Sequence, residues 1–224
     1  MTYQLTLRGH NGILLASDRR EGSFPASSAQ GEGSFHNMIP KIRLDPTRRF
    51  AWMFAGADVS VLAANYLERV FERGIPDGAL ERSLRDCCDL AWANGPSGLS
   101  GGSTIVLADG EKRNILRAKI MPVSEVLLIE EGRCFSGQSY SKASFFPHHF
   151  YASDMSVEQL AAMAAYTVQM AGEMDSLLIG GIDLAMYRKS VGHFEFADYG
   201  LLKECSTKID EEIRTCFRTA ILPL

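Results

Sequence analysis

The sequence predicts an α+β fold in which antiparallel sheets pack together and carry helices on their outer faces. Strands and helices come in separate runs along the 224 residues, not in the βαβ alternation of a doubly wound sheet. Some segments show apolar residues at every second position, and others show them at helical spacing. With 46% hydrophobic and 22% charged residues, we expect one globular domain over residues 1–224.

Strands are predicted where apolar residues alternate with polar ones or form short apolar runs between turns. Turn chemistry separates these runs, as at Gly9-His10-Asn11-Gly12, Asp45-Pro46 and Asp109-Gly110. A Gly/Ser-rich loop is expected over residues 21–38. In chain order the predicted strands cover residues 3–7, 13–17, 41–44, 50–55, 104–108, 113–120, 124–130, 180–187 and 193–196.

Two helices are predicted between the early and the middle strands. Apolar residues follow a helical period from Val59 onward, and Gly74 with Pro76 ends that helix. The second helix covers residues 78–93 and stops at an Asn-Gly-Pro sequence.

The C-terminal half predicts two longer helices and one short one. A helix that starts within residues 139–146 is limited by Pro147. Ser156 and Gln159 form a capping-box pattern ahead of the next helix. The closing helix spans residues 201–221, and we expect it to face inward through Leu202, Cys205, Ile209, Cys216 and Phe217.

Composition excludes several classes of function. A net charge of −4 provides no basic face for nucleic acid. No apolar run approaches the roughly 18 residues of a membrane span, and we expect no leader ahead of the first strand. Five cysteines match neither a disulfide framework nor a metal-site spacing, which favours the reducing cytoplasm.

No cofactor or metal site is predicted. His148-His149 has no further ligand at metal-site spacing and indicates a surface pair. The glycine-rich run at residues 98–103 lacks the lysine of a phosphate-binding loop. We expect Cys87-Cys88 to be one core thiol and one semi-exposed thiol.

The N-terminus offers a nucleophile. If Met1 is removed, Thr2 carries both a hydroxyl and a free α-amine. The pKa of such an amine is roughly 7.7–8.0, so part of it is unprotonated near neutral pH and can accept the hydroxyl proton, which we expect to pass through a water. A nearby buried lysine would favour this by lowering the pKa of both groups. A hairpin turn centred on His10 places Thr2 opposite Asp18, and a turn centred one residue later places Arg20 there. The plain alternative is a solvated N-terminus.

Three N-terminal stretches carry a family resemblance. MTYQLTLRGHNGILLASDRR, PKIRLD and AWMFAGADVSVLAANYLER resemble proteasome β-type subunits and bacterial HslV, which are N-terminal-nucleophile hydrolases. MDSLLIGGIDLAMY resembles the family's Asp-x-x-Ser-Gly-Gly-x-Ile-Asp-x-Ala. The resemblance implies a four-layer αββα sandwich of two antiparallel sheets.

The resemblance also implies a set of site residues. Thr2 matches the nucleophile, Asp18 and Lys41 its activating pair, and Gly56 the residue whose N–H stabilises the oxyanion. Asp175 matches the aspartate that organises the N-terminal amine, and Arg20 completes the acid-x-Arg pattern. The chain departs from the family pattern at three positions. Leu178 and Gln138 stand where the family has serines, and Ile179 stands where it has a glycine. Ser136 and Ser139 lie on either side of Gln138 and could replace the missing hydroxyl.

By resemblance, then, the chain is a threonine-type endopeptidase acting on polypeptides. Its copies would stack as double rings that enclose the active sites, with an ATP-dependent unfoldase as partner. Phe54 lies where the family lines its specificity pocket, which predicts a narrow pocket for small side chains. Two alternatives stay open: a ring that has lost or restricted its peptidase activity and acts as a binding cage, and a monomeric amidase of small amides. Asp183 lies inside an apolar strand, where a carboxylate is costly to bury unless it is paired. We expect it either to have a structural pairing partner or to have a catalytic role.

Overall fold

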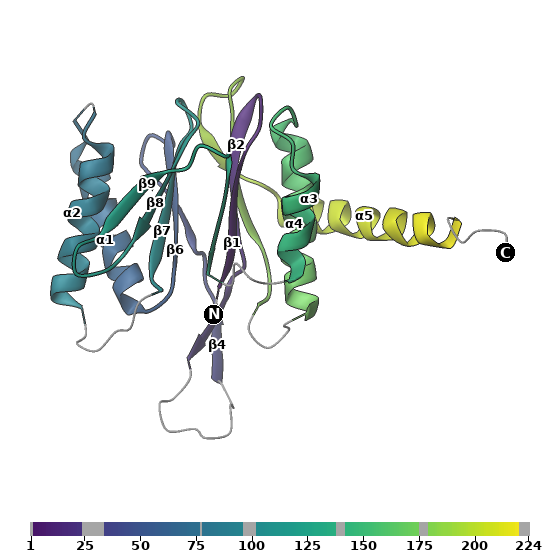
Figure 1. The fold of residues 1–224 in the computed structure, drawn as a ribbon, viewed down its shortest axis with the longest axis horizontal. Helices are drawn as coiled ribbons and strands as arrows, with labels where there is room; N and C mark the ends of the chain where they lie inside the picture. The colour runs from purple at the N-terminus through teal and green to yellow at the C-terminus, as the bar shows by residue number, and fades with distance from the viewer. Residues whose placement is uncertain are drawn as a thin grey trace.

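A computed structural model describes residues 2–23, 34–76, 78–95, 102–137, 142–174 and 179–219 of the chain. Within these residues two antiparallel five-stranded sheets lie face to face, and helices cover the outer face of each (Figure 1). This is the four-layer αββα sandwich that the sequence predicts.

The first sheet holds the N-terminal strand between two neighbours. Its strand order is β10-β1-β2-β11-β12, with β1 at Tyr3–Arg8, β2 at Gly12–Ser17, β10 at Arg133–Gly137, β11 at Asp183–Arg188 and β12 at Phe194–Phe196. β10 is not among the predicted strands, because its buried residues are Cys134 and Ser136 and produce no apolar alternation. The predicted strand over 180–187 begins only at Asp183.

The second sheet has the order β5-β6-β7-β8-β9. Its strands are β5 at Ile42–Leu44, β6 at Phe50–Ala55, β7 at Thr104–Asp109, β8 at Asn114–Lys119 and β9 at Glu125–Leu128. A separate pair, β3 at Arg20–Ser23 with β4 at Ser34–Met38, lies within the segment predicted to be a loop. That prediction is wrong at the two ends of the segment, where polar and glycine-rich strands show no hydrophobic period.

The register of the first hairpin differs from both predicted ones. Tyr3 lies opposite Asp18, and the Asp18 N–H donates to the Tyr3 carbonyl at 3.0 Å. The turn contains two residues, His10 and Asn11, between the hydrogen-bonded Gly9 and Gly12. Both predictions centred the turn on one residue, which changes which residues face each other. The expected pairing of Thr2 with Asp18 or Arg20 across the strands is therefore wrong.

Helices cover both outer faces. α1 and α2 lie on the second sheet, α4 lies on the first, and α3 packs against α4 (Figure 1). None of the described helices is both long and apolar enough to cross a membrane. The bounds are α1 Asp58–Arg73, α2 Leu80–Asn94, α3 Phe145–Phe150, α4 Val157–Met174 and α5 Tyr199–Thr219, with a 3-10 turn at Lys142–Ser144.

Local signals explain where the helices begin. The Ser156 N–H donates to Gln159 Oε1 at 2.8 Å, and the Gln159 N–H donates to Ser156 Oγ at 3.2 Å, which is the predicted capping box of α4. Pro147 is the third residue of α3 and so lies in its first turn, where proline is tolerated. It does not limit this helix as predicted.

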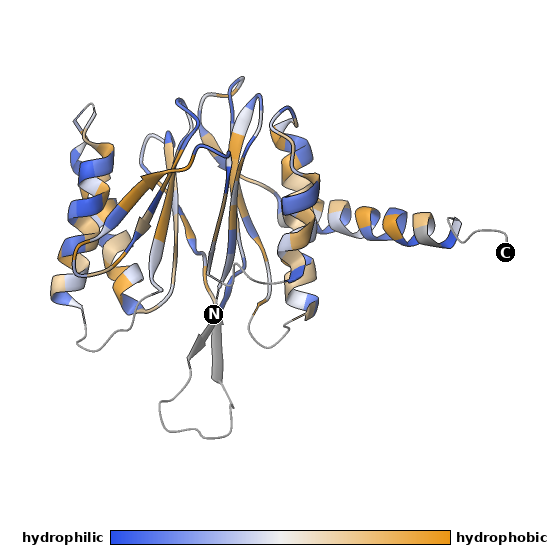
Figure 2. Cartoon of the chain, in the orientation of Figure 1, coloured by the Kyte–Doolittle hydropathy of each residue, from blue (hydrophilic) through white to orange (hydrophobic). Residues whose placement is uncertain are grey.

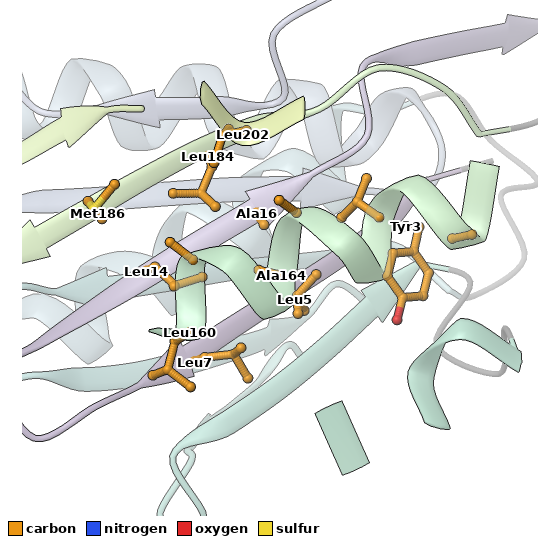
Figure 3. Packing of buried hydrophobic residues seen from close by; sticks show 14 of the residues in the cluster. Tyr3, Leu5, Leu7, Leu14, Ala16, Leu160, Ala164, Leu184, Met186 and Leu202 are labelled. Carbon is orange, nitrogen blue, oxygen red and sulfur yellow. The ribbon is translucent and has the colours of Figure 1, made fainter. Parts of the chain in front are cut away.

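Alternation along the strands divides the apolar residues into three clusters. One face of the first sheet packs against α4, where Leu5, Leu14 and Leu184 meet Leu160 and Ala164 (Figure 3). A second cluster lies between the two sheets, where their inner faces meet. A third cluster lies between the outer face of the second sheet and helices α1 and α2. Because burying a leucine stabilises by about 1.5–3 kcal/mol, this alternation fixes which face of each strand points inward.

Two burial predictions are wrong. Cys87 and Cys88 are both buried, because α2 is packed against α1 as well as the sheet. α5 projects from the body of the molecule, and apolar residues recur along its projecting part (Figures 1 and 2). Leu202 at its start is buried, but Cys216 is exposed. An amphipathic pattern predicts an apolar face without telling what covers it.

The middle of α5 lies between these extremes. Cys205 and Ile209 are partly buried, and the side chain of Phe217 lies outside the described residues.

Candidate active site

The side chains of Thr2, Asp18 and Lys41 meet in one place. Lys41 Nζ lies 3.0 Å from Thr2 Oγ1 and 3.0 Å from each carboxylate oxygen of Asp18. It also donates to the backbone carbonyl of Arg20 at 2.6 Å. The Lys41 and Asp18 side chains are only 5% and 0% exposed. The structure thus brings together the nucleophile and the activating pair that the resemblance implies.

Strands of both sheets deliver these residues. Thr2 directly precedes β1 and Asp18 directly follows β2, so the antiparallel pairing of these strands brings the two residues to the same end of the first sheet. Lys41 directly precedes β5 of the second sheet. The site therefore lies at the junction of the two sheets.

Hydrogen bonds orient the buried carboxylate of Asp18. The Tyr3 N–H donates to one oxygen at 2.8 Å, and the Arg20 N–H donates to the other at 3.1 Å. Burial raises the pKa of the Asp18 carboxyl above its usual value, while the Lys41 ammonium and these two N–H groups act in the opposite direction. The carboxylate is thus held in one orientation toward Lys41.

Asp183 supports Lys41 through the backbone. Its carboxylate accepts a hydrogen bond from the Lys41 N–H, and Arg19 Nε lies 3.4 Å from Asp183 Oδ1. Burial raises the pKa of Asp183, and Arg19 is the largest opposing influence. The partner expected for this carboxylate is present, in the form of Arg19 and the Lys41 N–H.

Gly56 forms the turn between β6 and α1. Its φ of +114° favours glycine, and a Cβ there would lie 2.6 Å from Ser103 Oγ. The Ser103 hydroxyl also accepts a hydrogen bond of 3.1 Å from the Ala57 N–H. Because Gly56 stands just before a helix N-terminus, its surroundings favour negative charge.

Gly137 lies close to the Thr2 backbone and was not identified from the sequence. It is the last residue of β10 and pairs with Tyr3. Its φ is +72°, and a Cβ there would lie 2.0 Å from the Thr2 carbonyl oxygen. The FSG sequence at residues 135–137 is the only local signal, and it does not show which residue approaches the glycine.

The supporting residues differ in how close they come to Thr2. The Arg20 guanidinium lies against Gly180, and Arg20 contacts Asp18 and Lys41 through its backbone N–H and carbonyl. Ser136 is buried and its hydroxyl donates to Gln4 Oε1 at 2.8 Å. Asp175 and Ser139 lie outside the described residues, as do the departures at Gln138 and Leu178.

Nothing in the described part of the chain resembles a metal centre. No group of three or more His, Cys, Asp or Glu side chains among these residues could hold a metal ion. His148 and His149 are both exposed, and their rings stack on Phe135 and Phe145.

The arrangement defines a fold. Two antiparallel sheets between helical layers, with a threonine ahead of the first strand and a buried Lys-Asp pair beside its hydroxyl, have the fold of proteasome β-type N-terminal-nucleophile hydrolases.

Among the solved structures that the chain resembles are those of Anbu, described as an ancestral β-subunit. A mutant Anbu from Hyphomicrobium sp. strain MC1 matches with a TM-score of 0.74 and 14% identity, over 100% of this chain and 99% of that one. A second structure of Anbu from that strain matches with a TM-score of 0.70 and 14% identity, over 99% of both chains. Anbu from Yersinia bercovieri matches with a TM-score of 0.73 and 15% identity, over 99% and 98%.

No family model and no curated protein matches the sequence. At these identities the likeness concerns the fold, and the function has to be argued from the site.

Proposed function

We propose that the chain is a threonine-type endopeptidase whose nucleophile is Thr2 Oγ1 after removal of Met1. The observation that carries this proposal is the 3.0 Å contact between Lys41 Nζ and Thr2 Oγ1, with Asp18 as the buried counter-ion. A cation beside a hydroxyl stabilises the alkoxide that forms as the proton leaves.

The chemistry follows from these groups. The free α-amine of Thr2 accepts the Oγ1 proton through a water, and Oγ1 attacks the carbonyl carbon of the peptide bond. The Gly56 N–H stabilises the resulting oxyanion, and the C–N bond breaks as the leaving amine takes up the proton. Water then attacks the carbonyl carbon of the acyl ester, the bond from that carbon to Oγ1 breaks, the peptide leaves as its carboxylic acid, and Oγ1 regains a proton as the hydroxyl. Asp175 has the role of orienting the α-amine.

We further propose that copies of the chain stack as rings around the active sites and receive polypeptides from an ATP-dependent unfoldase. A chamber gives control, because an accessible nucleophile of this kind would cleave exposed loops of other proteins. The support is the resemblance of the sequence and the fold shared with Anbu.

The residue before the cleaved bond is expected to be small. Phe54 is 6% exposed, and Arg43 Cζ lies 5.3 Å from its ring centroid, so the ring is held in place. By the resemblance, Phe54 stands at the position that lines the family's pocket. Hydrolysis rates of fluorogenic peptides with alanine or phenylalanine at that position test the preference. Faster hydrolysis of the phenylalanine peptide would contradict it.

A peptide epoxyketone tests the nucleophile, because it reacts with both the hydroxyl and the free amine of an N-terminal threonine. We expect intact mass spectrometry to show one adduct on Met1-free protein and none on Thr2→Ala. Thr6→Val is the matched control, since Thr6 is buried in the same strand and its hydroxyl has no hydrogen-bond partner among the described residues. An adduct on Thr2→Ala would refute the proposal.

The same material separates the two alternatives. A binding cage would form a large assembly that neither reacts with the epoxyketone nor cleaves peptides. A small-amide amidase would react but elute from a sizing column as a 24.7 kDa monomer.

A further inference from the structure

A polar row crosses the first sheet at the end that holds the site. Ser136, Gln4, Ser17 and Asp183 lie directly opposite one another on β10, β1, β2 and β11. Residues at paired positions share one face of a sheet. The next row on that face, two residues along each strand, belongs mainly to the inter-sheet core and comprises Cys134, Thr6, Leu15 and Ala185.

Gln4 links this row to the second sheet. It is 0% exposed, and its Nε2 donates to the Phe54 carbonyl at 2.8 Å and to Ser17 Oγ at 3.2 Å. Its Oε1 accepts the Ser136 hydroxyl at 2.8 Å. Because the Phe54 carbonyl only accepts hydrogen bonds, the amide nitrogen has to face it. The amide therefore has one orientation.

We propose that Gln4 is a positioning residue that sets the distance between Thr2 and the oxyanion donor Gly56. This inference rests on the proposed function. Gln4 lies two residues after Thr2 on β1, and its partner Phe54 lies two residues before Gly56 at the end of β6. The nucleophile and the oxyanion donor are on different sheets, and the Gln4 side chain bridges those sheets.

The pairing of β5 with β6 places the bridge beside the site. Ile42 lies opposite Met53, so Lys41 comes at the end of β6 where Phe54 and Gly56 follow. Lys41 also contacts Thr2, which brings the start of β1 to that same end of β6. The Gln4 bridge and the Lys41 contact thus hold the two sheets at neighbouring points.

A purely structural role would not require this amide. Replacing buried hydrogen-bonded groups together by apolar groups of similar shape is often neutral for stability. The geometry of acyl transfer is less tolerant, because a misplacement of about 1 Å can lower the rate about 100-fold. The two roles therefore predict different results for the same variants.

The test uses Gln4→Met, which keeps the side-chain length, alone and together with Ser136→Ala, which removes the hydroxyl left without an acceptor. Thr6→Val is the matched control on the same face of β1. Ser17→Ala leaves the Gln4–Phe54 bond in place and removes the weaker bond from Gln4, together with the 2.9 Å bond from the Ser17 hydroxyl to the Asp18 carbonyl. For each full-length, Met1-free protein we measure kcat and KM with a small-side-chain peptide. Affinity for a peptide boronate, which forms the tetrahedral adduct, is compared with affinity for the corresponding unreactive peptide.

We expect both Gln4 variants to lower kcat by about 10- to 100-fold with KM within about twofold. Boronate affinity should fall in parallel, while affinity for the unreactive peptide stays unchanged. Thr6→Val should match the wild type, and Ser17→Ala should lose less than Gln4→Met.

Other outcomes overturn the inference. If the double variant melts like the wild type and keeps its kcat, Gln4 has only a structural role. If affinity for the unreactive peptide falls as much as boronate affinity, Gln4 acts on substrate binding. Wild-type protein that hydrolyses no peptide refutes the proposed function and the positioning role with it. Active wild type with unaffected Gln4→Met refutes the positioning role alone.

Discussion

Replacing Asp18 with asparagine removes the carboxylate charge that pairs with Lys41, and its effect can be worked out from the geometry. Lys41 Nζ lies 3.0 Å from both oxygens of Asp18, and the two side chains are 5% and 0% exposed. Breaking a buried ion pair by removing one partner costs about 3–5 kcal/mol, because the remaining charge is left uncompensated. The neutral variant therefore destabilises the fold as well as the site.

The backbone contacts of Asp18 act in the same direction. The N–H groups of Tyr3 and Arg20 donate to different carboxylate oxygens, and an amide offers only one oxygen. In the asparagine variant, one of these two backbone N–H groups therefore faces the side-chain NH2 group, which is itself a donor. We expect Asp18→Asn to lower the free energy of unfolding by about 4 kcal/mol. For a chain of this size that corresponds to a melting temperature about 10 °C lower.

The assay combines thermal melting with the rate of epoxyketone labelling at Thr2. We expect Asp18→Asn to label at least about 100-fold more slowly than the wild type. Asp109→Asn is the matched control, because Asp109 is a buried carboxylate that pairs with Arg49 at the opposite end of the β6–β7 ladder. This control should melt earlier and label at the wild-type rate.

A double variant separates stability from chemistry. Asp18→Asn with Lys41→Met removes the uncompensated charge, so it should recover most of the lost stability and none of the labelling. An Asp18→Asn protein that melts and labels like the wild type would refute this reasoning.

Two further predictions concern backbone fit and thiol reactivity. Gly137→Ala should prevent labelling of Thr2, because its Cβ would lie 2.0 Å from the Thr2 carbonyl oxygen, whereas Gly192→Ala has a similar positive φ but no atom within 4 Å and should label normally. Equal labelling of the two variants, at a temperature where melting curves show both to be folded, would count against a role for Gly137. Burial raises the pKa of three cysteine thiols to about 11 or 12, so iodoacetamide at pH 8 should alkylate exposed Cys216 well before them in native protein. Peptide mapping measures this, and uniform alkylation of the native protein would contradict the burial.

Local periodicity predicted most of the fold. The alternation over residues 3–7 and the helical spacing after Val59 depend on which side of a strand or helix each side chain takes, and that is a property of neighbouring residues. The elements that were missed, β10 and the β3–β4 pair, are polar or glycine-rich and show no such period. Their strand structure depends on pairing partners far away in the sequence.

The site was predictable in its members but not in its contacts. The resemblance singled out Thr2, Asp18 and Lys41, and the structure brings them together. It did not indicate that Asp183 holds the Lys41 backbone or that Gln4 bridges the sheets. These polar residues lie in strands whose pattern alone is compatible with many partners.

The sequence by itself determined the strand and helix periods, the apolar faces and the identity of the candidate nucleophile, because these are encoded by residue types and short spacings. Only the tertiary structure decided that Tyr3 and not Thr2 faces Asp18, and that the Phe54 carbonyl accepts from Gln4. Register changes with a single residue in a turn, and a cross-sheet hydrogen bond requires a side-chain nitrogen and a carbonyl oxygen, 50 residues apart in the sequence, to lie within about 3 Å of each other.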